Sequence, residues 1–85
     1  MKKMINILTL ISLMVLGCAS EILIAEADVP QVVLAAFKSK YPQATEVAWE
    51  IEKEDGRLIY EAGFKQDGKK KEATFKPDGT WLEEE

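Results

Sequence analysis

Residues 45–82 read TEVAWEIEKEDGRLIYEAGFKQDGKKKEATFKPDGTWL, in which short stretches of alternating apolar and polar residues are separated by three Asp-Gly pairs. The pairs are Asp55-Gly56, Asp67-Gly68 and Asp78-Gly79. Asp-Gly suits the tight type I′ hairpin turn, because both central residues of that turn need a positive φ. Three such turns at near-even spacing predict an antiparallel meander of four strands.

Counting outward from the first two turns gives a register that can be checked on the sequence. The deduced cross-strand pairs are Ile51–Tyr60, Trp49–Ala62, Val47–Phe64, Tyr60–Phe75 and Ala62–Ala73. Two independent turns therefore align one continuous apolar face. A slip of one residue would move every one of these side chains to the opposite face of the sheet.

The third turn has a different sequence, Lys76-Pro77-Asp78-Gly79-Thr80. Pro and Asp suit the central positions of a type I turn, and Gly79 then takes the left-handed position of a three-residue hairpin loop. This loop sets Trp81 opposite Phe75 and turns Trp81 toward the apolar face.

The opposite, outer face of the predicted sheet has two unusual cross-strand pairs. Ala48 opposes Gly63, which leaves a flat area without large side chains. Glu50 opposes Glu61, and like charges at directly opposed positions destabilise a strand pair. Such a pair marks either a site for a cation or basic partner or a solvated pair of carboxylates.

A single helix precedes the strands. Asp28-Val29-Pro30 is a start signal, Pro42 ends the run, and the residues between them place apolar side chains on one stripe at helical spacing. We therefore expect an α+β fold in which one N-terminal amphipathic helix packs on one face of a four-stranded antiparallel meander sheet. The predicted core residues are Val33, Phe37, Trp49, Ile51, Tyr60, Phe64, Phe75 and Trp81.

The composition limits the chemistry. The chain has 85 residues, a formal net charge of −4, one cysteine and no histidine. No intramolecular disulfide and no histidine-based catalysis or metal site can be built, and a mildly acidic domain is a poor nucleic-acid binder.

The N-terminal segment has the pattern of a signal peptide. Met1-Lys2-Lys3 is basic, and the apolar run from Ile5 to Leu16 is too short for a comfortable membrane span. Gly17-Cys18 resembles the end of a lipobox, in which Cys18 would become the lipidated first residue. Ala25-Glu26-Ala27 is a small-x-small cleavage signal. Cleavage one or two residues beyond Cys18 and an uncleaved anchor are the other two interpretations.

All four interpretations place the protein outside the cytoplasm, in the periplasm or anchored to the outer membrane as a lipoprotein. Membrane contact is then expected only through the signal or a lipid anchor. We divide the chain into a leader, residues 1–27, and one domain, residues 28–85.

The sequence predicts no enzyme, no cofactor and no metal site. It has no Gly-rich phosphate loop and no Ser-His-Asp set. The carboxylates at positions 46, 50 and 52 alternate along one strand, which is typical of a solvated edge. Asp55, Asp67 and Asp78 are explained as turn residues.

The domain resembles the PepSY-like family of small secreted bacterial proteins, described as β-lactamase-inhibitor-like. The matching segments are Val29-Pro30, Phe37, Tyr41-Pro42, Ala48-Trp49-Glu50, Tyr60-Glu61-Ala62, Phe64, Asp67-Gly68 and Phe75-Lys76-Pro77-Asp78-Gly79-Thr80-Trp81. The resemblance spans residues 28–85 and implies a helix packed on an antiparallel sheet. Family members often carry two such units, whereas this chain has one. Related domains in protease propeptides suggest restraint of an extracytoplasmic protease.

These observations lead to three functional hypotheses. The first is a non-enzymatic, inhibitor-like binding module of the cell envelope that acts on an unknown protein partner. The second is a periplasmic sensor of a small ligand or cation, and the third is one half of a structural homodimer. The candidate contact residues are Glu50, Ile59 and Glu61 on the outer face and Asp55, Gly56, Asp67 and Gly68 at the hairpin tips.

Overall fold

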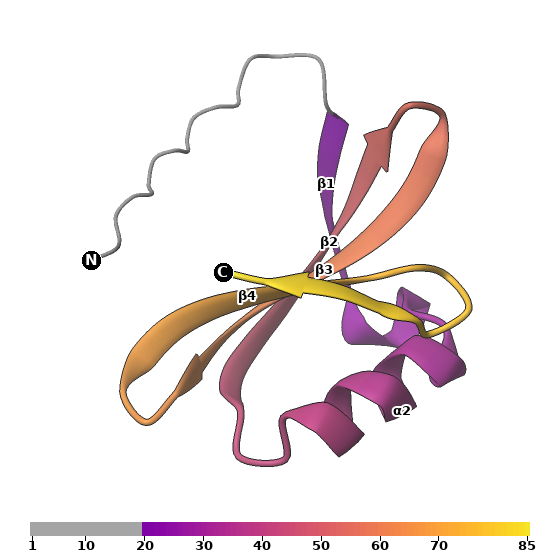
Figure 1. Cartoon of the computed structure of the whole chain (residues 1–85). Coiled ribbons are helices and arrows are strands. Elements are labelled where there is room, and N and C mark those ends of the chain that lie inside the picture. Colours follow the sequence, from indigo (N-terminus) through magenta and orange to yellow (C-terminus); the bar gives the residue numbers. More distant parts are fainter. Residues whose placement is uncertain (1–19) are drawn as a thin grey trace.

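The computed structural model describes residues 20–85, which form one antiparallel sheet and one α-helix (Figure 1). The sheet is a meander in which each strand pairs with the next in the order β1-β2-β3-β4-β5. A 3₁₀ turn, η3 (Glu26–Asp28), joins β1 to the helix α2 (Gln31–Lys40). The strands are β1 (Ser20–Ile24), β2 (Thr45–Glu54), β3 (Arg57–Gln66), β4 (Lys69–Phe75) and β5 (Trp81–Glu84).

The predicted α+β class with an antiparallel sheet is confirmed, but the expectation of four strands behind an N-terminal helix is wrong. A fifth strand, β1, precedes the helix and pairs antiparallel with β2, with Ser20 opposite Lys53 and Ile24 opposite Trp49. The sequence analysis places residues 20–24 in the leader, which it ends at the small-x-small motif Ala25-Glu26-Ala27. The edges of the sheet are therefore β1 and β5, and the first predicted strand is not an edge.

The leader itself is mostly outside the described part of the chain. Residues 1–19, and with them the predicted lipidation site Cys18, are not described by the structure. Within residues 20–85, no helix is both long enough and apolar enough to cross a membrane.

The turn predictions are confirmed in detail. Asp55 and Asp67 have φ values of 51° and 54°, and each is followed by a glycine at 76°, as a type I′ turn requires. Ile51 lies opposite Tyr60, and Tyr60 lies opposite Phe75. The deduced register holds from Ala48 onward, and a bulge between Thr45 and Ala48 then places both Glu46 and Val47 opposite Phe64, where the sequence predicted Val47 alone. Glu46, inside that bulge, has a φ of 52°.

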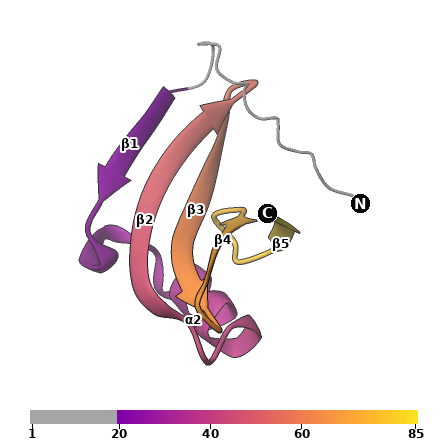
Figure 2. The same ribbon diagram turned by 90° about the vertical axis from the view of Figure 1, so that its left-hand side faces the viewer.

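One side chain of α2 connects the helix to three strands. The ring of Phe37 lies edge-on to Trp49 of β2, Phe64 of β3 and Phe75 of β4, with centroid distances of 5.3, 5.2 and 6.2 Å. Edge-to-face pairs at these distances add to the stabilisation from burial alone. The long strands β2 and β3 curve over the helix (Figure 2), so one short helix covers the concave face.

The buried residues belong to one cluster around this ring. Its members are Val29, Val33, Phe37, Tyr41, Trp49, Tyr60, Ala62, Phe64, Ala73 and Phe75, with Ile51 partly buried against them. All of them project from α2, its flanks or the inner face of the sheet. The outer face therefore has no covering layer among the described residues.

Trp81 was predicted to be a core residue, and this is wrong. It lies opposite Phe75 and on the helix side of the sheet, but 41% of it remains exposed. Its indole N–H donates to the Tyr41 hydroxyl at 3.0 Å, and that hydroxyl donates to Glu84 at 2.8 Å. The Lys40 ammonium lies 4.5 Å from the Trp81 ring centroid. The charged groups of Glu84 and Lys40 need contact with water, so Trp81, which lies among them, stays at the edge of the core and is partly exposed.

We predict that Gly79→Ala destabilises the protein more than Gly68→Ala. Both glycines have positive φ, +94° and +76°, so each substitution carries a strain of about 1 kcal/mol. A Cβ at Gly79 would also lie 3.0 Å from Val32 Cγ2 and 3.0 Å from its carbonyl oxygen, whereas a Cβ at Gly68 meets nothing within 4 Å.

Chemical denaturation should therefore give losses of about 1 kcal/mol for Gly68→Ala and about 2–3 kcal/mol for Gly79→Ala. Equal losses would show that the third turn does not press against the helix.

Candidate functional site

The structure separates the predicted contact residues into three places. Glu50, Ile59 and Glu61 share the outer face of the sheet, because Glu50 pairs with Glu61 and Ile59 lies two residues before Glu61 on β3. The turn at Asp55-Gly56 joins β2 to β3, and the turn at Asp67-Gly68 joins β3 to β4, so the tips lie at opposite ends of β3 (Figure 1). The two tips therefore cannot insert together into one partner cleft.

Four carboxylates converge on the outer face. Glu21 of β1 pairs with Glu52 of β2, and Glu50 of β2 pairs with Glu61 of β3. One oxygen from each of the four side chains lies within 4.8 Å of all the others. We call these four residues the carboxylate cluster. Three neighbouring strands position it, so its geometry depends on the register of the sheet.

Glu52 is the buried member of the carboxylate cluster. Only 9% of it is exposed, and it is the one charged residue in the buried part of the described chain. The two ion pairs formed within residues 20–85 are Lys65–Glu46 at 3.7 Å and Lys71–Glu84 at 3.4 Å, and neither reaches the cluster. A buried carboxylate without a cationic partner is costly, because burial removes its water, and at Glu52 hydrogen bonding with Glu61 replaces only part of that hydration.

The electrostatics of the cluster reflect this crowding. Burial raises the pKa of Glu50, Glu52 and Glu61 above the usual value for glutamate, and the charge of Glu21 adds to the rise for Glu50 and Glu52. Burial is the main cause of the rise in the pKa of Glu61 to about 10, and hydrogen bonding adds to it, because the single O–H of the protonated form can donate to Glu52 or to Glu72. The cluster therefore retains a proton at neutral pH unless another positive charge takes its place.

The geometry of the cluster suits a hard divalent cation. Calcium–oxygen distances are about 2.3–2.6 Å, so oxygens on opposite sides of one calcium ion lie about 4.6–5.2 Å apart. The four carboxylate oxygens, all within 4.8 Å of one another, fit inside such a shell. Magnesium, with bonds of about 2.0–2.1 Å, would require the cluster to contract. Zinc prefers nitrogen and sulfur ligands, and the chain has no histidine.

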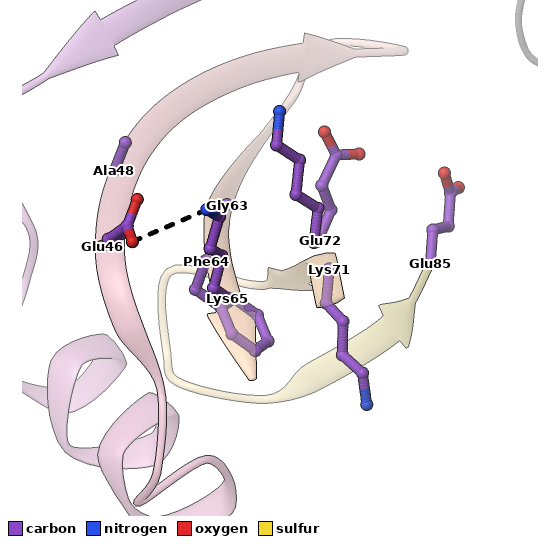
Figure 3. A pocket seen from close by; sticks show the side chains of 9 residues that line it. Glu46, Ala48, Gly63, Phe64, Lys65, Lys71, Glu72 and Glu85 are labelled. Atoms are coloured by element: carbon purple, nitrogen blue, oxygen red, sulfur yellow. Dashed lines mark ion pairs between the residues drawn. The ribbon is translucent and has the colours of Figure 1, made fainter. Parts of the chain in front are cut away.

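A shallow groove lies beside the carboxylate cluster on the same face. It encloses about 500 Å³, and its floor is formed where Ala48 opposes Gly63. Charged side chains of both signs surround this floor, with the Glu46–Lys65 ion pair at one wall and Glu72 at another (Figure 3). The flat area deduced from the sequence is therefore the bottom of a groove with charged walls.

Sequence reasoning found half of the carboxylate cluster. It identified the Glu50–Glu61 pair, but it treated Glu52 as part of a solvated edge and placed Glu21 in the leader. Both errors have one cause, since Glu52 is buried and Glu21 is brought to it only when β1 covers the edge of β2. A search for strand pairing between residues 20–24 and 49–53 would have found both.

Comparisons with protein-family models, with curated proteins and with solved structures found no match to this chain. The resemblance to the PepSY-like family therefore stays a prediction, and the site has to be interpreted from its own geometry.

We predict that the metal-free protein loses stability as the pH rises from 5.5 to 8.5. The folded-state pKa values of Glu50, Glu52 and Glu61 are raised, so the folded state binds more protons than the unfolded state above the ordinary glutamate pKa of 4.5. The contribution of these protons is lost as the pH rises. Three further carboxyls face these residues, those of Glu21, Glu54 and Glu72. Their negative charges raise the pKa values further.

After allowance for solvent screening at half-exposed groups, the expected loss is about 1 kcal/mol, or roughly 5 °C in melting temperature. Glu61→Gln should flatten this dependence, whereas Glu83→Gln, an exposed carboxyl of β5, should keep it. A melting temperature in Glu61→Gln with the wild-type pH slope would contradict the assignment.

Proposed function

We propose that this protein is a non-enzymatic binding module of the bacterial cell envelope whose ligand at the outer sheet face is a hard divalent cation, with calcium favoured. The observation that carries the proposal is the convergence of Glu21, Glu50 and Glu61 on Glu52, which is buried and forms no ion pair with a lysine or arginine of residues 20–85. Proteins seldom bury a carboxylate without a positively charged partner. A bound cation supplies that partner.

Carboxylate oxygens are the ligands that calcium prefers, and four carboxylates can provide six to eight oxygens when some bind through both. Calcium sites of extracellular modules have dissociation constants of about 10⁻⁴–10⁻³ M, which suits the predicted export of the chain. The resemblance to PepSY-like proteins points to the same compartment. This function is the cation sensor of the second hypothesis from the sequence.

The test is calcium titration of the full chain in a non-ionic detergent at pH 8. Binding is followed by isothermal titration calorimetry and stability by thermal melting. At a calcium concentration of 100 times the dissociation constant, the folded state should gain about 2.7 kcal/mol. For a domain of this size the melting temperature should rise by about 10 °C or more. Magnesium at the same concentration should produce a smaller rise.

The informative variant is Glu52→Gln, with Glu83→Gln as the matched control. Removing the buried charge relieves repulsion, so Glu52→Gln should melt at or above the wild-type temperature without calcium and respond weakly to it. Glu83→Gln should respond as the wild type does. A wild-type chain that shows no calorimetric signal with calcium, or a Glu52→Gln chain with the full rise, would refute the proposal.

The groove beside the carboxylate cluster favours a second candidate function, the binding of an extended peptide from a protein partner. Its flat Ala48–Gly63 floor leaves room for a main chain, and its walls carry both charge signs. A Cβ at Gly63 would meet only the Ala48 carbonyl oxygen, at 4.0 Å, so Gly63→Leu should fold while filling the floor. We expect the wild type, and not Gly63→Leu, to copurify with a partner from the host envelope; equal recovery by both would exclude the groove.

A further inference from the structure

A hollow lies at the end of β4, where its neighbour β3 extends further than β4 does. Tyr60 pairs with Phe75, the last residue of β4, so residues 57–59 of β3 have no strand partner on that side within the described chain. Pro77 has no backbone N–H and cannot continue the ladder, and the chain turns there toward β5. The hollow that remains has a volume of about 340 Å³ and is lined by Arg57, Leu58, Ile59, Lys76, Pro77 and Leu82.

The lining of this hollow combines apolar side chains with two positive charges. The charges belong to Arg57 and Lys76, and no lining residue carries a carboxylate. Glu54 lies opposite Arg57 in the register, but the ion pairs within residues 20–85 include neither cation. The Asp78 carboxylate, two residues beyond Lys76, accepts the Thr80 N–H at 2.9 Å within its own turn. Both cations are therefore available to a ligand.

We infer that this hollow binds a small amphipathic anion, a free aliphatic carboxylate with a chain of about eight carbons. The carboxylate binds to Arg57 and Lys76, which donate charge-assisted hydrogen bonds. The aliphatic chain covers Leu58, Ile59 and Leu82 and removes their apolar surface from water. The volume of about 340 Å³ equals that of roughly eleven water molecules at about 30 Å³ each, and octanoate has a similar number of non-hydrogen atoms.

Charge complementarity selects this class of ligand. A neutral apolar molecule would leave Arg57 and Lys76 without a partner, and a cationic one would be repelled by both. Glu52 lies opposite Ile59, so its negative charge orients the ligand with its carboxylate toward the two cations. The hollow shares no residue with the carboxylate cluster, and the inference therefore goes beyond the proposed cation site. It also gives a ligand contact to Ile59, which the sequence predicted as a contact residue.

The experiment is a titration of the full chain with octanoate in a non-ionic detergent without calcium, followed by NMR of the methyl groups. The methyl signals of Leu58, Ile59 and Leu82 should shift and saturate, with a dissociation constant of about 1 mM for a ligand of about ten non-hydrogen atoms. Acetate, which lacks the chain, and octanol, which lacks the charge, should each bind about tenfold more weakly.

Three variants test the role of the two cations. Arg57→Gln and Lys76→Gln should each weaken octanoate binding about fivefold, because each removes one charged partner of the carboxylate. Lys69→Gln removes the same charge from an exposed lysine at the other end of β4 and should bind as the wild type does.

Three results would overturn the inference. The first is equal affinity in the wild type and all three variants, the second is equal affinity for octanoate and octanol, and the third is the absence of a saturable shift in these methyl groups up to about ten times the expected dissociation constant. None of them bears on calcium binding, because the variants lie outside the carboxylate cluster and calcium is absent.

Discussion

The fold depends on the contacts that one aromatic side chain, Phe37, makes with the sheet. Phe37 contacts Trp49, Phe64 and Phe75, and so joins α2 to the three central strands. A helix of ten residues would be marginal in water without such contacts. Because the described part of the chain has one α-helix, that helix can cover only one face of the sheet. The other face is left free of packing constraints, and the candidate site lies there.

The freedom of the outer face explains why repulsive carboxylates are tolerated. Register and turn geometry are fixed by the inner face and by the Asp-Gly turns, so Glu50 and Glu61 are held opposite each other whatever their charge. Because the inner face stabilises the fold, the outer face can carry side chains that repel one another. Unfavourable arrangements of this kind occur most often at functional sites. The buried Glu52 is the clearest departure in this chain, and the proposed cation accounts for it.

The parts of the fold that the sequence predicts depend on residues close together in the chain. The part that it does not predict, the pairing of β1 with β2, joins residues far apart in the chain. The two Asp-Gly turns fix their hairpins within about ten residues, and period-two alternation then identifies the inner face from the sequence alone. The strand β1 has no turn to connect it with β2, because the whole helix lies between them, and Ile22-Leu23-Ile24 does not alternate. Two members of the cluster were missed with it, since Glu21 belongs to β1 and pairs with Glu52. Trp81 was misplaced because polar contacts with Tyr41 hold it at the rim.

Protons and cations compete for the carboxylate cluster, because either one reduces the repulsion among its four carboxylates. Because the raised pKa of Glu61 keeps a proton available near neutrality, a calcium ion must displace it in order to bind. Calcium affinity should therefore increase with pH, by the same linkage that lowers the stability of the metal-free protein.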